Sequence, residues 1–247
     1  MFTAGAKMFG VDGRYSKIDA DELSRRLDSW PGGAPHHVQP SAISISQVSE
    51  FGAVWSVAEA GAVGEIARRH GLKLHMDGAR FGNAVAALGC SPAEITWRAG
   101  VDILSFGATK NGALAAEAIV VFDPDLAASL PFRRMKAGQL LSKGRFLAAQ
   151  LLAYLNDDHW LELARHSNAM AGKMGSAIEA AANARLAVPV DANEVFAFIS
   201  PSVNAALKSA GAVYHGWPSG FPDPADPPKG EETLVRFVTS FQTAGQE

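Results

Sequence analysis

The sequence predicts an α/β fold, in which a first part with a mainly parallel sheet is followed by a smaller α+β C-terminal domain. Short apolar, β-rich runs alternate with helical segments as far as residue 122, a pattern typical of parallel strands joined by helices that cover both sheet faces. After Asp123 the pattern changes to long helical stretches and then to short strands. We therefore place the two parts at residues 1–135 and 136–247.

Capping and turn signals mark the first elements. Residues 16–27, SKIDADELSRRL, place apolar residues at helical spacing, with Asp19 as a plausible N-cap and Glu22 three residues later. The alternating run AISISQ (42–47) predicts a strand. An alanine-rich helix follows it and stops at Gly71.

Three further strands are predicted in the first part, at residues 72–76, 101–106 and 118–122. Between the first two, SPAE (91–94) has a capping-box pattern with proline at the first helical position. This pattern predicts a helix that ends before Gly100.

The second part is expected to be helical at first and then to form a small sheet. Two long helical stretches are predicted at about residues 133–156 and 158–184. Further on, the sequence predicts short strands near 186–190 and 195–199, a proline-rich loop at 218–229 and a final strand within LVRFVTSF (234–241).

Composition excludes several classes of protein. The hydrophobic content of 48% is ample for a buried core. The net charge is −3 and no Lys/Arg block occurs, so no nucleic-acid or membrane partner is indicated. No long apolar run suggests a membrane span. The single cysteine, Cys90, excludes an intrachain disulfide and suits a reducing compartment, so we expect a cytoplasmic protein.

The chemistry-bearing residues follow two predicted strands. Asp77 comes directly after LKLHM and Lys110 follows VDILSFG, and ligands of open α/β sheets bind beyond the carboxyl ends of the strands. A lysine amine forms an imine with an aldehyde, and a carboxylate facing a pyridine nitrogen keeps that nitrogen protonated. The pair predicts a site for pyridoxal phosphate. Taken singly, the aspartate could be a turn residue and the lysine a solvated one.

Four motifs carry a resemblance that covers most of the chain. The motifs are HMDGARF (75–81), SPAEITWRAGVD (91–102), FGATKNG (106–112) and AGQLLSKGRF (137–146). In this order they resemble the low-specificity threonine aldolases, which are PLP-dependent enzymes of fold type I. The resemblance implies a fold-type-I large domain, incomplete here, and a small C-terminal domain. In the family a further N-terminal portion supplies a histidine that stacks on the cofactor and a loop that binds its phosphate, and this portion is expected to be missing here.

The resemblance also implies roles for individual residues. Lys110 matches the lysine that binds the cofactor, and Asp77 matches the partner of the pyridine nitrogen. Arg80 matches an arginine near the cofactor's phenolic oxygen and the substrate carboxylate, and Arg236 matches one whose fork holds that carboxylate. Arg145 in SKGRF resembles a position near the phosphate.

A histidine in the loop before the strand at 42–47 matches the catalytic histidine of the family in approximate position. His36 is the candidate to accept the proton of the substrate β-hydroxyl, and the adjacent His37 leaves the choice open. A loop histidine in solvent is the alternative for both.

The implied activity is cleavage of L-threonine, L-allo-threonine and related β-hydroxy-α-amino acids to glycine and an aldehyde. The family further implies a homo-oligomer, a tetramer or a dimer. Two other interpretations stay open. The chain could be another PLP lyase of the same fold, such as a phenylserine aldolase or a β-eliminating lyase, or it could be an inactive, truncated fragment of a threonine aldolase.

Overall fold

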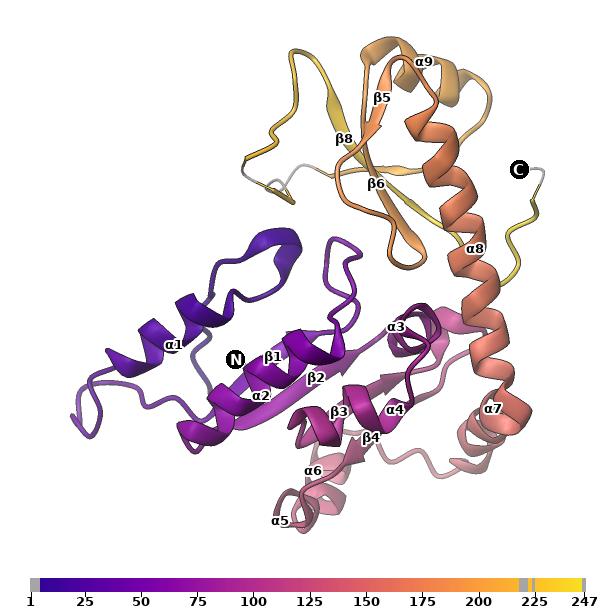
Figure 1. The fold of residues 1–247 in the computed structure, drawn as a ribbon. Coiled ribbons are helices and arrows are strands. Elements are labelled where there is room, and N and C mark those ends of the chain that lie inside the picture. Colours follow the sequence, from indigo (N-terminus) through magenta and orange to yellow (C-terminus); the bar gives the residue numbers. More distant parts are fainter. Residues whose placement is uncertain (1–4, 218–221, 224, 246–247) are drawn as a thin grey trace.

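The computed structural model describes residues 5–217, 222–223 and 225–245, and it contains two four-stranded sheets joined by a long helix (Figure 1). The first sheet has the order β1-β2-β3-β4, and the second has the order β5-β6-β8-β7. The strands are β1 (Ala42–Ser46), β2 (Lys73–Gly78), β3 (Ile103–Gly107), β4 (Glu117–Val121), β5 (Ala184–Leu186), β6 (Glu194–Ile199), β7 (His215–Gly216) and β8 (Thr233–Val238).

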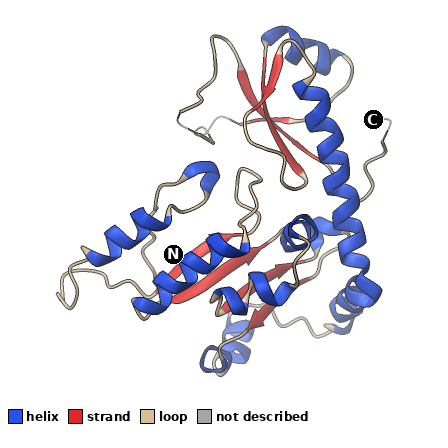
Figure 2. Cartoon of the chain, in the orientation of Figure 1, coloured by secondary structure: helices blue, strands red, loops and turns tan. Residues whose placement is uncertain are grey.

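Helices alternate with the strands of the first sheet, and a series of helices connects β4 to the second sheet (Figure 2). They are α1 (Ala20–Asp28), α2 (Val57–Arg69), α3 (Phe81–Leu88), α4 (Pro92–Ile95), α5 (Pro124–Ala127), α6 (Leu130–Lys136), α7 (Arg145–Leu155), α8 (His159–Glu179) and α9 (Pro201–Ser209). Single 3₁₀ turns occur at η1 (Arg14–Ser16), η2 (Trp97–Ala99), η3 (Thr109–Asn111) and η4 (Asn156–Asp158).

Local capping explains where the first helices begin. The Asp19 carboxylate accepts a hydrogen bond from the backbone N–H of Glu22 at 2.8 Å, which confirms the predicted N-cap of α1. A capping box formed by Ser56 and Glu59 opens α2. The predicted capping box at SPAE (91–94) is also present, and it opens α4.

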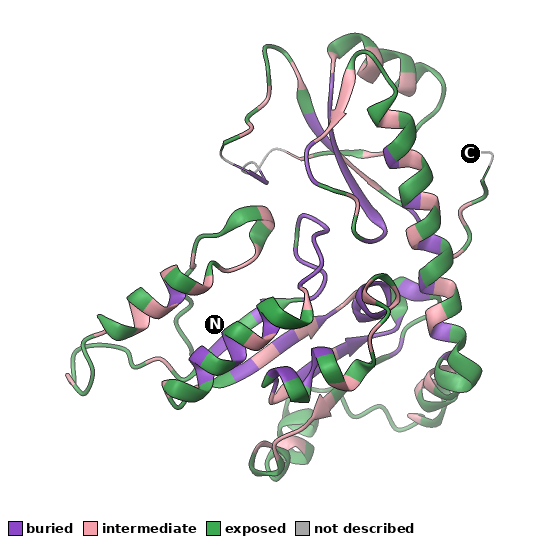
Figure 3. Ribbon diagram, viewed as in Figure 1, coloured by how far each residue is buried: buried purple, intermediate pink, exposed green. Residues whose placement is uncertain are grey.

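In the first sheet, β1, β2 and β3 are parallel and β4 is antiparallel to β3, so the prediction of a mainly parallel sheet is confirmed. Alternate residues of these strands pack against α2, α3 and α4 in one core. They include Ile43, Ile45, Leu74, Met76, Leu104 and Phe106. Figure 3 shows this buried layer between helices and sheet.

The opposite face of the first sheet carries polar side chains. Ser44 and Ser46 are exposed, and His75 and Asp77 are partly exposed. Ile119 on β4 is 62% exposed. Helices were predicted on both faces, but in the described part of the chain the strand residues of this face remain open to solvent.

The second sheet is antiparallel, and β6, which is buried along its whole length, lies at its centre. One side of β6 packs against α8 and α9. On its other side Phe196 contacts Phe51 at a ring distance of 5.2 Å. Phe51 lies in the loop that connects β1 to α2, and Figure 1 shows this loop reaching toward the second sheet. The end of β1 is thereby held against the second sheet.

Helix α8 belongs to both parts. Near its middle, the side-chain amide of Asn83 on α3 donates hydrogen bonds to Ser167 and Asn168, each at 2.9 Å. Tyr154 and Trp160, which follow the predicted boundary at residue 136, pack in the core of the first sheet. The second sheet therefore begins its own packing within α8, well after residue 136.

Several predicted boundaries were wrong. The helical stretch predicted at 133–156 is broken after α6, where Gly138 has a left-handed backbone (φ +70°), and resumes at α7. The helix after Ser91 ends at Ile95 and gives way to η2. The strand predicted near 186–190 lies at β5 instead. The predicted loop at 218–229 falls partly outside the described residues.

Within the described residues the structure has neither a membrane-spanning helix nor a metal-binding cluster. No helix there combines the length and apolar character needed to cross a bilayer. No group of three or more His, Cys, Asp or Glu side chains is arranged to hold a metal ion.

Candidate active site

Three parallel strands bring polar residues together at their carboxyl ends. Asp77 on β2 lies between Ser46 on β1 and Ser105 on β3 in the sheet register. Lys110 follows β3 in the short turn η3. The two residues predicted to hold the cofactor therefore lie at the carboxyl ends of two neighbouring strands, on the same edge of the sheet.

Asn111, the neighbour of Lys110, anchors the turn. Its buried side-chain amide donates to the Tyr154 hydroxyl at 2.7 Å and to the backbone carbonyl of Trp160 at 2.8 Å. Burial raises the pKa of Tyr154 to about 12, so the phenol stays protonated at neutral pH. These bonds fix the backbone of η3, while the Lys110 side chain stays exposed.

Close packing between strand ends defines the place of Asp77. A Cβ atom at Gly107 would lie 2.8 Å from the Cα of Ala79, so only glycine lets the end of β3 come this close to the segment after β2. The Asp77 carboxylate accepts a hydrogen bond from the backbone N–H of Ala79 at 3.1 Å through Oδ1.

His75 lies two residues before Asp77, on the same face of β2. Its Nδ1 contacts the Ser44 hydroxyl at 2.8 Å, and its Nε2 contacts the Ser105 hydroxyl at 3.0 Å. Burial lowers the pKa of His75, and the negative charge of Asp77 opposes this effect in part. The imidazole is therefore neutral at neutral pH and connects the three strands.

A buried ion cluster joins the two sheets beside these residues. Glu194, the first residue of β6, has a side chain that is 1% exposed. Its Oε1 forms an ion pair with Arg80, the residue before α3, at 3.0 Å, and it accepts a hydrogen bond of 3.5 Å from a guanidinium nitrogen of Arg236 on β8. The Arg236 guanidinium also lies over the Trp217 ring, 4.4 Å from its centroid.

Electrostatic effects connect this cluster to the lysine and aspartate. Burial raises the pKa of Glu194, while Arg80, Arg236 and Lys110 lower it. Burial lowers the pKa of Arg80, and the negative charges of Glu194 and Asp77 act against this. Lys110, Asp77, Arg80 and Arg236, predicted separately from sequence, thus share one electrostatic environment.

Sequence analysis missed two carboxylates at this site. Glu194 directly precedes the apolar run VFAFI (195–199), and an acid at the start of a buried strand was the available signal. Glu50, in the loop after β1, is exposed, and its charge raises the pKa of both Arg80 and Glu194. Nothing in the sequence around Glu50 distinguishes it from a solvated loop residue.

Two predicted site residues are not brought to the cluster. His36 is exposed and lies in the loop before β1, at the amino end of the strand, whereas Asp77 stands at the carboxyl edge. A five-residue strand spans about 16 Å, so the geometry of this chain does not support a shared site. Its neighbour His37 lies in the same loop and contacts it with rings 5.8 Å apart. Arg145, at the start of α7, lies over Phe146, and its role stays a prediction.

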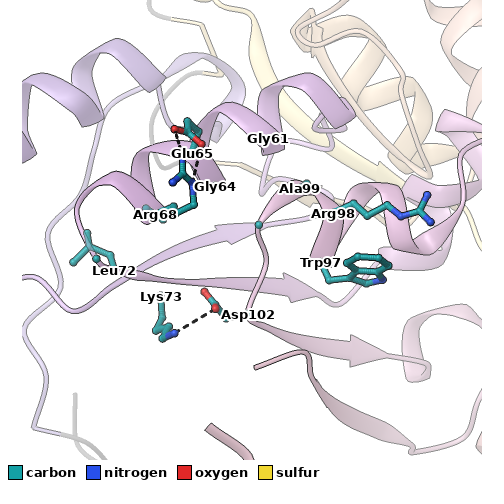
Figure 4. Close-up of a pocket in the computed structure, with 13 residues that line it drawn as sticks. Gly61, Gly64, Glu65, Arg68, Leu72, Lys73, Trp97, Arg98, Ala99 and Asp102 are labelled. Carbon is teal, nitrogen blue, oxygen red and sulfur yellow. Dashed lines mark hydrogen bonds and ion pairs between the residues drawn. The ribbon is translucent and has the colours of Figure 1, made fainter. Parts of the chain in front are cut away.

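A surface pocket lies at the other end of the first sheet (Figure 4). Its lining includes Lys73 at the start of β2, Trp97 in η2, and Asp102, which precedes β3. Lys73 is already paired there, with Asp102 at 3.6 Å and with Asp123 at 2.6 Å. This pocket is remote from the candidate active site, and its charges are largely compensated.

The chain is similar in sequence to curated threonine aldolases. The chain is 45% identical over 176 residues to the low specificity L-threonine aldolase of Pseudomonas aeruginosa and 44% identical over 176 residues to that of a Pseudomonas strain. Each alignment covers 71% of this chain and 51% of the relative, so the chain spans about half the length of these relatives.

Among solved structures, the Leishmania major threonine aldolase superposes with a TM-score of 0.87 at 25% identity, covering 98% of this chain and 67% of that chain. The predicted fold class, that of the fold-type-I enzymes, is thereby confirmed. The family model described as beta-eliminating lyase matches residues 1–202. The chain therefore belongs to the beta-eliminating lyase family.

Proposed function

We propose that the protein to which this chain corresponds cleaves L-threonine, L-allo-threonine and related β-hydroxy-α-amino acids to glycine and an aldehyde, with pyridoxal phosphate as cofactor. The observation that carries this proposal is the placement of Lys110 and Asp77 at neighbouring strand ends, beside two arginines that share one buried glutamate. The likeness to threonine aldolases supports the reaction type.

The side chains of this edge fit part of such a cofactor. The Lys110 amine is exposed and available to an aldehyde, and the Asp77 carboxylate has one oxygen, Oδ2, with no hydrogen-bond partner among the described residues. The buried Nε atoms of Arg80 and Arg236 also lack partners within the described structure. The side chains at this edge therefore include an amine for the cofactor aldehyde, a carboxylate for its ring nitrogen, and guanidinium donors for the carboxylate of an amino-acid substrate.

When bound, pyridoxal phosphate would supply an electron sink for the pair of electrons left when the Cα–Cβ bond of the substrate breaks. Lys110 would hold its aldehyde carbon through the side-chain amine. Asp77 would keep the pyridine nitrogen protonated, because an ionised carboxylate at that atom stabilises the positive charge. Neutral His75 would add no positive charge beside Asp77.

The arginines would orient the substrate. Arg80 and Arg236 would hold its α-carboxylate, and the stacking of Arg236 on Trp217 fixes the plane of that guanidinium. A carboxylate held in one orientation sets which bond at Cα stands perpendicular to the cofactor ring, and this choice decides the reaction. The phenylserine aldolase and β-eliminating lyase alternatives differ in what the substrate carries at Cβ.

We also propose a homo-oligomer in the cytoplasm. Exposed apolar side chains on α6 and on α7 support self-association, because Phe132, Met135 and Leu152 are 78%, 64% and 73% exposed. The single cysteine suits a reducing compartment. Sedimentation velocity of the protein would test the first point, and a strictly monomeric species would contradict it.

The proposed function is tested by loading the chain with pyridoxal phosphate and reducing it with borohydride. Mass spectrometry should locate the label on Lys110, and aldehyde should form from L-threonine and not from L-alanine. Lys110→Ala should abolish the label, whereas Asp77→Asn should keep the label and lose turnover. Specific label at another lysine, or full turnover by Asp77→Asn, would overturn the assignment. A panel containing phenylserine and β-chloroalanine separates the alternatives.

A further inference from the structure

Glu194 is enclosed between the two parts of the chain. Its side chain is 1% exposed, and among the described residues only its Oε1 is engaged, by Arg80 at 3.0 Å and by Arg236 at 3.5 Å. The loop after β1 closes over it, since a Cβ at Gly52 would lie 3.1 Å from the Glu194 Cβ. Nothing in the proposed chemistry requires this carboxylate, yet it occupies both arginines.

The charges of Arg80, Arg236 and Glu194 determine how much negative ligand charge the cluster can compensate. Arg80 and Arg236 carry two positive charges and Glu194 carries one negative charge, so this trio has a net charge of about +1 by its ordinary ionisation states. The two guanidiniums repel each other, as the lowering of the Arg80 pKa by Arg236 indicates. Glu194 is thus the counter-ion that allows both to be buried together.

The free donors match a single ligand carboxylate. The side chains of Arg80 and Arg236 are 15% and 22% exposed, and each gives only one of its two terminal nitrogens to Glu194 within the described part of the chain. One carboxylate has two oxygens, which N–H donors on the two different arginines can bind, and it would neutralise the remaining charge of the trio. Within the trio, a second ligand carboxylate would meet Glu194 with no positive charge left to compensate it.

We propose that Glu194 is a positioning residue that limits the arginine pair to one external carboxylate, and so selects amino acids with a neutral β-substituent over dicarboxylic ones. This inference rests on the proposed function, in which the two arginines bind the substrate carboxylate. Glu194 touches neither substrate nor cofactor, and it acts through the charge and spacing of Arg80 and Arg236.

The test compares two ligands that differ by one charge, L-threonine and L-threo-3-hydroxyaspartate. Binding to the cofactor-free chain is followed by NMR through the Nε–H resonances of the arginines. We expect the wild-type chain to bind L-threonine more tightly. Glu194→Gln retains the shape and an acceptor oxygen but leaves one more positive charge, so its preference should shift at least about tenfold toward the dicarboxylate, because a unit charge at a few ångströms in a partly buried site is worth more than tenfold in affinity.

Two further variants separate charge from structure. Glu194→Asp keeps the charge and should keep the wild-type preference, with weaker binding of both ligands. Glu232→Gln is the matched control, because Glu232 pairs with Arg185 at 2.9 Å in the same sheet and should leave the preference unchanged. Should Glu194→Gln fail to fold, the wild-type and Glu194→Asp preferences decide.

Equal or tighter binding of the dicarboxylate by the wild-type chain would overturn the inference, as would an unchanged preference in a folded Glu194→Gln. Failure of either ligand to bind would overturn it as well. These outcomes are read without cofactor, so they are independent of labelling at Lys110. A chain with the expected preference but no label at Lys110 would keep the inference on Glu194 and refute the proposed function.

Discussion

Replacing Asn111 with alanine should destabilise the turn that carries Lys110 and weaken cofactor attachment together. The variant loses both side-chain bonds, to the Tyr154 hydroxyl at 2.7 Å and to the Trp160 carbonyl at 2.8 Å. Each net bond is worth about 1 kcal/mol, and the buried Tyr154 hydroxyl left without its donor adds about 1–3 kcal/mol. The free energy of unfolding should fall by about 3 kcal/mol.

Urea denaturation measures this loss, and Tyr154→Phe separates its parts. That variant removes only the hydroxyl that accepts one bond, so it should cost about 1 kcal/mol, and the double variant should cost less than the sum. Borohydride labelling of Lys110 should be slower in Asn111→Ala than in Tyr154→Phe. A loss below 0.5 kcal/mol in Asn111→Ala, on the order of a surface substitution, would refute the argument that these bonds hold η3.

Three other predictions concern the first sheet. The pKa of His75 is lowered from 6.5, so the folded chain binds this proton more weakly than the unfolded chain. The contribution of His75 to the free energy of unfolding is therefore fully present above about pH 6.5 and is lost as the pH falls. His75→Asn should flatten this pH dependence in urea titrations between about pH 7 and 5. Gly107→Ala should lower the free energy of unfolding by about 1–3 kcal/mol, since its Cβ would meet the Ala79 backbone at 2.8 Å, and an unchanged urea midpoint would contradict this. Ser56→Ala should cost about 1 kcal/mol through the capping box with Glu59, with no effect on labelling of Lys110, and a lost label would show that α2 couples to the site.

Local signals in the sequence predicted most of the first part. Asp19 caps α1 and Ser91 opens α4 as expected, because caps depend on residues three positions apart. The four strands of the first part, and the positions of Asp77 and Lys110 at or just after the ends of two of them, also followed from the alternation of elements. Such features are decided within short stretches of chain, where single-sequence arguments apply.

What could not be predicted depends on contacts distant in sequence. Glu194 and Arg80 are 114 positions apart by their numbering, and no local pattern announces their pairing. The division of the helical stretch at Gly138 followed from a left-handed residue that sequence alone treats as tolerable within a helix. The role of His36 stays a prediction, since its loop lies at the amino end of β1 and the described residues do not bring it to Asp77.

The arginine cluster makes docking of the two parts and construction of the site a single event. Arg80 stands on the first part, whereas Glu194 and Arg236 stand on the second sheet, so Glu194 gains Arg80 as a partner only when the parts meet. Separation would leave Arg80 without its counter-ion and Glu194 with Arg236 alone, and packing of Phe51 on Phe196 would be lost as well. Burial of apolar rings therefore supplies the attraction, and the ion pair between Arg80 and Glu194 favours the register in which the two charges meet. Within the described residues three buried atoms of the cluster lack a hydrogen-bond partner, namely Arg80 Nε, Arg236 Nε and Glu194 Oε2. The cluster persists despite this cost because the arginines proposed to bind a substrate carboxylate also join the two parts of the chain.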